Sequence, residues 1–419
     1  MEKIIIEGGI PLCGEARVHG AKNSVLPILA ASLIVSGISV IHNCPDLSDV
    51  RASIKILVNL GCRCSREEDT LIIDATDVNC CVIPENLMRE MRSSIVFLGA
   101  IAARCKKAYI SSPGGCEIGP RPIDLHLSAL KELGLKINEV HGCIDCECDT
   151  GLKGKSIYIP IPSVGATENI MIAAATAEGT TKIYNAAREP EIEDLANFLN
   201  KAGAKIKGAG SSDIIVEGVK ALHGVEHTVI PDRILTATYM SAIAITGGKA
   251  VIKNICPRHL KAIISEYEGL GCKIKTNRNQ MQVSSDTPLN RLKKVRTQYY
   301  PGFPTDAGPT LIATTSIAKG TSIFVETIFE NRFKFADELN RLGADVKVEG
   351  RTAVVEGVSE LQGASVNCTD LRGGAALMVA GFAAKGKTEI GEIQHIIRGY
   401  ETPEIYFKEL GARIKRIKV

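Results

Sequence analysis

One segment of the 419-residue chain places a thiol and a guanidinium in surroundings that suit chemistry. Between residues 111 and 126 the sequence reads SSPGGCEIGPRPIDLH, which holds Cys116 and Arg121. Its three glycines and three prolines predict a loop, between an apolar strand ending near residue 110 and a helix beginning near residue 125. A thiol beside a fixed positive charge ionises more easily than a free one. We therefore expect Cys116 to act as an acid or nucleophile; the alternative is a small residue tolerated in a turn.

The composition excludes several classes of protein. Net charge is only +3, aromatic residues make up 4%, and there is no Trp, so we predict no nucleic-acid partner. Hydrophobic residues make up 45%, but no apolar stretch is long enough to span a bilayer and the first residues lack a secretory pattern. We predict a cytoplasmic enzyme without membrane contact. The 14 cysteines are irregularly spaced and are expected to be reduced thiols.

Three of these cysteines, Cys143, Cys146 and Cys148, lie close enough in sequence to suggest a soft-metal site. No second pair follows at the spacing of zinc ligands. We therefore favour a solvated hairpin and predict no metal. The sequence also has no dinucleotide fingerprint, and we predict no organic cofactor.

A repeat of about seventy residues organises the whole chain. A helix end followed by glycine and an apolar strand recurs at intervals of 68 to 73 residues, at Gly61, Gly134, Gly203, Gly271, Gly343 and Gly411. Each repeat is predicted to run helix, strand, helix and hairpin. The first helix, rich in Ala and Ser, should be buried on all sides, whereas the second exposes Lys and Glu. The pattern predicts an α/β protein of two pseudo-symmetric domains with three repeats each.

We expect domain 1 to span residues 21–229 and domain 2 to combine residues 1–20 with 230–419. Two linkers, near residues 20 and 230, would then permit hinge closure over a ligand. The N-terminal strand at residues 3–7, together with residues 16–19, is expected to complete the last repeat beside the C-terminal strand at residues 412–419.

The start of each buried helix carries polar residues at equivalent places in the repeat. The marker positions are Asn23, Arg92, Gly165, Arg233, Asp306 and Arg372. Helix N-termini present unpaired N–H groups and partial positive charge, so three such ends facing a common cleft would bind anions.

Simple capping by Ser24, Thr167 and Asp306 is the alternative interpretation. Capping does not account for the cations Lys22, Arg92, Arg233 and Arg372, which oppose the helix dipole. We therefore predict a phosphorylated or carboxylated substrate as their partner. Asp306, a carboxylate among cations, is predicted to accept a proton.

These residues together resemble the UDP-N-acetylglucosamine enolpyruvyl transferases. The resemblance extends from residue 3 to the C-terminus. Its motifs include HGAKNS at residues 19–24, MRSS at 91–94, PGGCEIGPRPIDLH at 113–126, SVGAT at 163–167, AREPE at 187–191, PTD at 304–306, ENR at 330–332 and RGYE at 398–401. It implies two inside-out α/β domains and transfer of an enolpyruvyl group from phosphoenolpyruvate to the 3′-hydroxyl of UDP-N-acetylglucosamine, with release of phosphate. This is the first committed step of peptidoglycan synthesis, and so bears on cell-wall biogenesis, cell shape and cell division.

The resemblance also implies roles for individual residues. Lys22, Arg121 and Arg398 would hold phosphoenolpyruvate with Arg92 and Arg372 nearby. Cys116 would protonate its methylene carbon, could trap it covalently, and would be the target of fosfomycin. Asp306 would take the proton of the sugar hydroxyl. The uridine nucleotide and sugar would be positioned by Asn23, Arg121, Pro122, Ile123, Asp124, Leu125, Ser163, Val164, Gly165 and Ile328.

Three places depart from the family pattern and leave alternatives open. Glutamines usually follow the Thr-Asp motif, where this chain has Gly308 and Thr310; Asp commonly precedes Arg-Gly-Tyr, where it has Ile397; and some members have Lys in place of Ile161. One alternative is an enzyme of the same fold with another acceptor, such as shikimate 3-phosphate. The other is a non-catalytic paralogue that binds uridine nucleotides.

Overall fold

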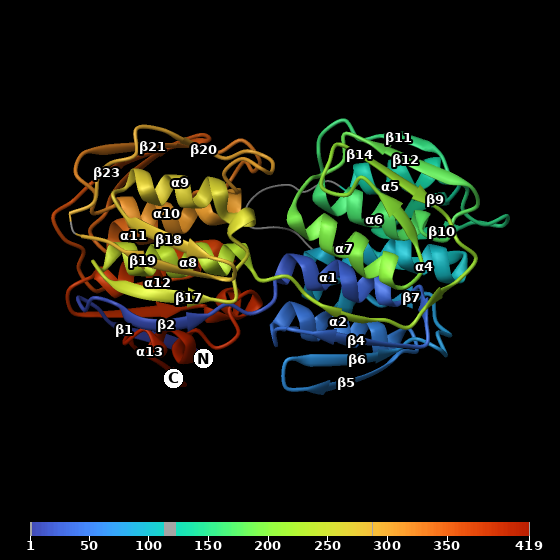
Figure 1. The fold of residues 1–419 in the computed structure, drawn as a ribbon, viewed down its shortest axis with the longest axis horizontal. Helices are drawn as coiled ribbons and strands as arrows, with labels where there is room; N and C mark the ends of the chain where they lie inside the picture. The colour runs from blue at the N-terminus through green and yellow to red at the C-terminus, as the bar shows by residue number, and fades with distance from the viewer. Residues whose placement is uncertain (1, 113–122, 287, 419) are drawn as a thin grey trace. The chain divides into compact units, whose positions relative to one another are not determined.

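The structure, a computed structural model, describes residues 2–112, 123–286 and 288–418. The described chain divides into two compact units (Figure 1). The Lys22 unit comprises residues 20–112 and 123–230, and the Asp306 unit comprises residues 2–19, 231–286 and 288–418. The chain therefore passes from one unit to the other next to residue 20 and again next to residue 230.

The Lys22 unit contains three four-stranded sheets and a short two-stranded one. Its helices are α1 (Lys22–Ser32), α2 (Ser48–Asn59), α3 (Glu85–Glu90), η1 (Arg92–Val96), α4 (Phe97–Cys105), α5 (Asp124–Glu132), α6 (Val164–Ala174) and α7 (Pro190–Lys201). The first sheet has the order β16 (Glu226–Thr228), β4 (Ile38–His42), β6 (Thr70–Asp74) and β5 (Arg63–Glu67). The second is β7 (Val82–Ile83), β8 (Lys107–Ser111), β10 (Cys143–Glu147) and β9 (Lys136–Val140). The third is β11 (Ser156–Tyr158), β12 (Thr180–Tyr184), β14 (Asp213–Glu217) and β13 (Lys205–Lys207), and β15 (Leu222–His223) pairs with β3 (Val35–Ser36).

The Asp306 unit repeats this plan with its own three sheets. Its helices are α8 (Arg233–Ile245), η2 (Pro257–Leu260), α9 (Lys261–Gly269), η3 (Thr305–Ala307), α10 (Gly308–Thr315), α11 (Ala336–Arg341), α12 (Leu371–Ala383), η4 (Ile393–Arg398) and α13 (Pro403–Glu409). One sheet is β18 (Lys273–Asn277), β19 (Gln280–Ser284), β17 (Lys249–Lys253) and β2 (Cys13–Arg17). The second is β20 (Val295–Arg296), β21 (Thr321–Val325), β23 (Thr352–Glu356) and β22 (Asp345–Glu349). The third is β24 (Ser365–Asn367), β25 (Lys387–Gly391), β1 (Glu2–Glu7) and β26 (Arg413–Lys418).

All six four-stranded sheets share one pairing scheme. The strand after each buried helix is parallel to an edge strand on one side and antiparallel to another strand on the other. In the second sheet, Ile110 of β8 lies opposite Ile83 of parallel β7 and opposite Ile144 of antiparallel β10. The predicted repeat of helix, strand, helix and hairpin is confirmed, and with it the α/β fold of repeated units.

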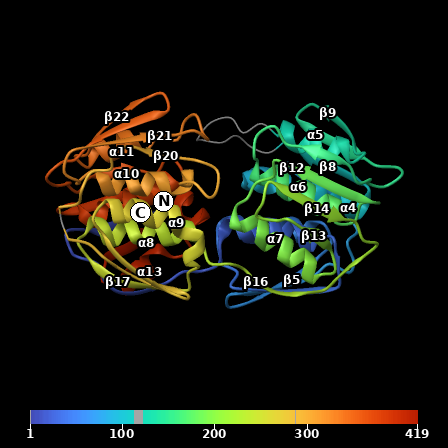
Figure 2. The same cartoon turned by 45° about the horizontal axis from the view of Figure 1, so that its top comes forward.

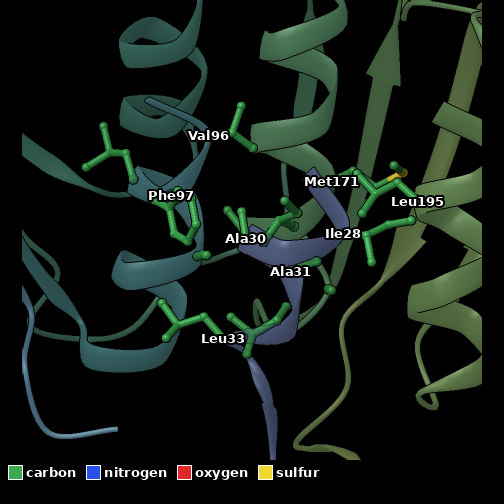
Figure 3. Packing of buried hydrophobic residues seen from close by; sticks show 14 of the residues in the cluster. Ile28, Ala30, Ala31, Leu33, Val96, Phe97, Met171 and Leu195 are labelled. Carbon is green, nitrogen blue, oxygen red and sulfur yellow. The ribbon is translucent and has the colours of Figure 1, made fainter. Parts of the chain in front are cut away.

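The first helix of each repeat is buried on all sides, as its small apolar residues predict. In α1 every residue except Asn23 is buried, and α8 is buried along its whole length. Figure 3 shows Ile28, Ala30 and Ala31 of α1, and Leu33 just after it, among residues of neighbouring helices: Val96 and Phe97, Met171 of α6 and Leu195 of α7. Small Ala side chains permit this close packing because they leave little volume between helices. The second helices are amphipathic and expose one face, as α7 does with Glu193 half-exposed and Leu195 buried.

Glycines end the outer helices where the backbone turns left-handed. The six repeat glycines have φ between 81° and 104°, a conformation in which a Cβ is strained. The buried helices also end at glycines with positive φ, except in the second repeat. There Lys106 takes the same left-handed conformation with φ of 59°, so the backbone turn is retained without a glycine.

The predicted pairing of the N-terminal strand is confirmed for β1 and wrong for β2. Strand β1 lies antiparallel to β26, with Ile5 opposite Lys415, and completes the last repeat. Strand β2 instead runs parallel to β17 of the fourth repeat, with Ala16 opposite Ile252. In four repeats the segment just before the buried helix supplies the parallel edge strand. In the other two these strands are exchanged: β2, which precedes α1, pairs with β17, and β16, which precedes α8, pairs with β4. Figure 2 shows β17 in its own unit beside α8 and α13.

The Cys143–Cys148 segment forms the predicted hairpin strand, with Cys143 opposite Val140 of β9. Its solvated character is only partly confirmed, because Cys146 and Cys148 are buried beneath the sheet. Over the part of the chain that the structure describes, no cluster of His, Cys, Asp and Glu is arranged to hold a metal ion. Within the same residues, every helix is too short or too polar to cross a membrane.

Candidate functional site

Lys22 begins α1 and forms a buried ion pair with Asp49 of α2. The Nζ–Oδ2 distance is 2.7 Å, and the side chains are 10% and 4% exposed. An ion taken out of water is stable only with a close partner of opposite charge. Asp49 therefore supplies negative charge that we expected a substrate alone to provide.

The first turn of α1 is also hydrogen-bonded to α7. Ser24 Oγ donates a hydrogen bond to Asp194 Oδ2, and the same oxygen accepts from Ile230 N at 3.2 Å. The other carboxylate oxygen lies 3.0 Å from His227 Nε2. Asp194 thus links the start of α1, where Lys22 and Asn23 lie, to residues 227–230 at the end of the Lys22 unit.

The alternative interpretation, in which Ser24, Thr167 and Asp306 cap their helices, is wrong. Ser24 and Thr167 lie inside their helices, and the Asp306 carboxylate forms ion pairs instead. The observed caps lie just before the helices: Ser163 accepts from Ala166 N at 3.3 Å, Asp232 from Ile234 N at 2.7 Å, and Asp370 from Arg372 N at 3.0 Å.

In the Lys22 unit, the starts of α5 and α6 come together around His126. The His126 Nδ1 atom lies 3.1 Å from Asn169 Nδ2. A Cβ on Gly165 would lie only 2.9 Å from the imidazole, so the absence of a side chain at residue 165 permits this packing. Burial lowers the pKa of His126 to about 4, and the positive charge of Arg92 adds to that effect. Arg92 is therefore close enough to act electrostatically on this cluster.

The predicted nucleotide-binding residues of this unit occupy the same two helix starts. Ile123 and Leu125 are half-buried and Asp124 is exposed where α5 begins. Ser163, Val164 and Gly165 are half-buried where α6 begins, and Ile161 just before them is exposed. The structure therefore leaves all of these residues accessible to a ligand. Cys116, Arg121 and Pro122 lie outside the described residues.

In the Asp306 unit, the predicted base is gripped by two guanidinium groups. Asp306 Oδ1 accepts from Arg332 Nη2 at 2.8 Å, and Oδ2 accepts from Arg372 Nη2 at 2.9 Å. The arginine side chains are 2% and 5% exposed, whereas Asp306 is 24% exposed. The two arginines thus fix the orientation of the Asp306 carboxylate, and part of the Asp306 side chain remains exposed to solvent.

Arg372 is buried in the first turn of α12. Burial alone lowers the pKa of its guanidinium, but the neighbouring Asp306 carboxylate outweighs that effect and the pKa is raised. Arg372 also bonds the hydroxyl of Tyr400, which lies 2.8 Å from Thr238 Oγ1 of α8. Tyr400 follows the η4 turn that carries half-buried Arg398, so one network links the helix start to that turn.

Two residues of this arrangement were not foreseen as contacts. Asp49 was absent from the predicted site, although an acid on the apolar face of an amphipathic helix is a sign of a buried partner. Arg332 belongs to the ENR motif but was given no role in the predicted site, and its side chain is only 2% exposed. The third helix start of the unit also carries a buried cation, Arg233, whose guanidinium lies 5.8 Å from the ring centre of Tyr300.

Comparison with known proteins decides the family. The sequence model of EPSP synthase (3-phosphoshikimate 1-carboxyvinyltransferase) matches residues 6–405. The chain belongs to this carboxyvinyltransferase family. Among the relatives within the family, UDP-N-acetylglucosamine 1-carboxyvinyltransferase 2 of Caldanaerobacter subterraneus is 52% identical, with 100% of both chains covered. UDP-N-acetylglucosamine 1-carboxyvinyltransferase 1 of Symbiobacterium thermophilum is 50% identical over 99% of this chain and 95% of its own.

Solved carboxyvinyltransferase structures share the fold. The enolpyruvyl transferase NikO from Streptomyces tendae has a TM-score of 0.90 and 24% identity, covering 100% of this chain and 99% of its own. An EPSP synthase from Acinetobacter baumannii has a TM-score of 0.77 and 16% identity with full coverage of both chains. At these identities the likeness concerns the fold and not the acceptor.

Proposed function

We propose that the protein transfers the enolpyruvyl group of phosphoenolpyruvate to the 3′-hydroxyl of UDP-N-acetylglucosamine and releases phosphate. The observation that carries the proposal is Asp306, held between two buried arginines in the place where the family resemblance puts a base. The full-length relatives at about half identity support the choice of acceptor.

The reaction is an addition followed by an elimination. The Cys116 thiol gives its proton to the methylene carbon of phosphoenolpyruvate, and positive charge develops at the neighbouring carbon. The 3′-oxygen of the sugar bonds to that carbon while its proton passes to Asp306. The methyl group then returns a proton to the Cys116 thiolate, the carbon–oxygen bond to phosphate breaks, and phosphate leaves with the electron pair of that bond. Acid and base catalysis of this kind contributes roughly 10²- to 10⁴-fold in rate.

The cations of the site hold the negatively charged substrate. Lys22, Arg121 and Arg398 bind the phosphate and carboxylate of phosphoenolpyruvate, and Arg92 and Arg372 add positive charge nearby. Fixed cations at the places where negative charge gathers lower the barrier because they need no reorganisation during the reaction.

The nucleotide-sugar is bound by helix starts. It is contacted by Asn23, Arg121, Pro122, Ile123, Asp124, Leu125, Ser163, Val164, Gly165 and Ile328. The N-terminus of α6 suits a diphosphate because a helix start carries partial positive charge. The chemistry requires neither a metal nor an organic cofactor.

The biological setting follows from the product. We infer a cytoplasmic enzyme of peptidoglycan synthesis, needed for cell-wall growth and division and inhibited by fosfomycin at Cys116. The free thiols of the described cysteines support a reducing compartment.

An acceptor panel tests the proposal. With phosphoenolpyruvate present, we expect phosphate release with UDP-N-acetylglucosamine and none with shikimate 3-phosphate. Release only with the shikimate ester would overturn the proposed acceptor, and nucleotide binding without any release would show a non-catalytic paralogue.

A further inference from the structure

A second carboxylate, Glu326, lies behind the Asp306–Arg332 pair. It follows strand β21 and its residue is only 2% exposed. Its backbone N–H donates to Arg351 O at 2.8 Å, which fixes it to the end of the sheet. The proposed reaction gives this buried charge no direct role.

The Glu326 carboxylate accepts from four donors. Oε2 accepts from Thr305 Oγ1 at 2.8 Å. Oε1 accepts from Thr297 Oγ1 at 3.0 Å, from Ile328 N at 2.7 Å and from Phe329 N at 3.1 Å. A buried carboxylate is stable when hydrogen bonds replace its lost water, and bonds to a charged acceptor are stronger than neutral ones.

Two of these donors, Thr305 and Phe329, are neighbours of the two residues of the ion pair. Thr305 immediately precedes Asp306, and its carbonyl oxygen accepts from Arg332 Nη2 at 3.1 Å. On the other side, the Phe329 ring lies 5.7 Å from the Arg332 guanidinium carbon. Glu326 therefore holds the residue next to the carboxylate and the residue whose ring lies against the guanidinium.

The same carboxylate also fixes Ile328, a proposed contact of the nucleotide-sugar. Thr297 strengthens this loop, because its Oγ1 accepts from Thr327 N at 2.9 Å while donating to Glu326. One buried side chain thus sets the backbone of a substrate-binding loop and the turn that presents the base.

We propose that Glu326 is a positioning residue. It holds the base Asp306 and the loop at Ile328 in the relative positions that attack by the sugar hydroxyl requires. The inference rests on the proposed function, in which Asp306 receives the proton. A displacement of about 1 Å in a catalytic group can lower the rate by about 100-fold, so the loss of this anchor acts on the transfer step.

The test compares single-turnover rates of transfer from phosphoenolpyruvate to UDP-N-acetylglucosamine. Thr305→Val removes the hydroxyl from which Glu326 Oε2 accepts, and we expect a single-turnover rate about tenfold lower and a lower thermal midpoint, because a buried carboxylate loses one of its donors. Thr305→Ser restores the hydroxyl and should recover most of the rate.

Glu326→Ala should lower the single-turnover rate by about 100-fold. Glu326→Gln should lose less, because its amide can keep Oε1 as acceptor and donate to Thr305 Oγ1.

The matched control is Thr321→Val, which breaks another hydroxyl–carboxylate bond, to exposed Glu356 at the end of β23 in the same sheet. It should leave the rate unchanged. A second readout is the covalent adduct of Cys116 with phosphoenolpyruvate, measured by intact mass, which needs no base and should persist in Thr305→Val.

The outcomes separate the two claims. A wild-type rate in Thr305→Val, or a slow rate that Thr305→Ser does not recover, overturns the role of Glu326 while the proposed function stands. A wild-type protein that transfers nothing overturns the proposed function and this inference with it.

Discussion

Lys22 Nζ lies 2.7 Å from Asp49 Oδ2, and the two side chains are almost completely buried where α1 meets α2. Lys22, which is predicted to bind phosphoenolpyruvate together with Arg121 and Arg398, is therefore oriented by the protein before any ligand binds. A preoriented cation costs less to organise around an anion than a mobile one.

Asp49→Asn should destabilise the protein by about 3 kcal/mol, because it removes the negative charge that lies 2.7 Å from the buried Lys22 ammonium. It should also raise the KM for phosphoenolpyruvate. Urea unfolding and steady-state kinetics measure the two effects. The control is Asp46→Asn, which removes a more exposed pair with Arg51 and should cost less than about 1 kcal/mol. Equal losses in both variants would contradict a special role for Asp49.

Asp306→Asn should lower the single-turnover rate by about 10²- to 10⁴-fold, since the amide cannot accept the sugar proton. Adduct formation between Cys116 and phosphoenolpyruvate should continue in this variant, because that step requires only the acid. Asp345→Asn, at a half-exposed carboxylate on β22 of the same unit, is the control and should retain full activity. Loss of the adduct in Asp306→Asn would show that the residue does more than accept the proton.

Fosfomycin should label Cys116 and no other thiol. Burial raises the pKa of Cys62, Cys146 and Cys272 to about 12, so these thiols are poor nucleophiles near neutral pH. Intact mass should show one adduct on the wild type and on Cys13→Ala, which removes an exposed thiol, and none on Cys116→Ala. Cys116→Asp should keep some turnover and escape labelling. Labelling of Cys116→Ala would identify a different reactive thiol.

His126 should make stability depend on pH. Its pKa is lowered by burial from 6.5 to about 4. Between these two pH values the residue is protonated in the unfolded chain and neutral in the folded chain. Arg92 acts in the same direction and Asp124 opposes it. The contribution is complete above pH 6.5 and is lost as the pH falls.

Between pH 7 and pH 5 the free energy of unfolding should decrease by about 2 kcal/mol through this residue. Urea unfolding at the two pH values measures the change. His126→Gln, which retains a polar group beside Asn169, should show a smaller decrease. The same decrease in both proteins would assign the pH dependence to other groups.

The repeat made most of the fold predictable. Gly61 and its equivalents marked the ends of the outer helices, and the small residues of α1 marked a helix buried on every side. Lys106 shows that the backbone geometry, rather than glycine itself, is the repeated feature. The partner of β2 could not be predicted, because it depends on two strands, β2 and β17, that are separated in sequence by the whole Lys22 unit.

The candidate site was predictable in residue type and less so in its contacts. Lys22 and Arg372 stood out because cations oppose the dipole at a helix start, and Asp306 stood out as a carboxylate among cations. Asp49, Arg332 and Glu326 act through contacts made only when helices and loops from distant parts of the sequence pack together. Their buried charges have no local signature beyond an ionisable residue in an apolar surrounding.

Mass spectrometry of the reaction products tests the proposed transfer most directly. After incubation with phosphoenolpyruvate and UDP-N-acetylglucosamine, we predict a uridine nucleotide-sugar heavier by one carboxyvinyl group, formed in equal amount to the phosphate released. Phosphate without the heavier nucleotide, or an unchanged nucleotide with active enzyme present, would contradict the transfer.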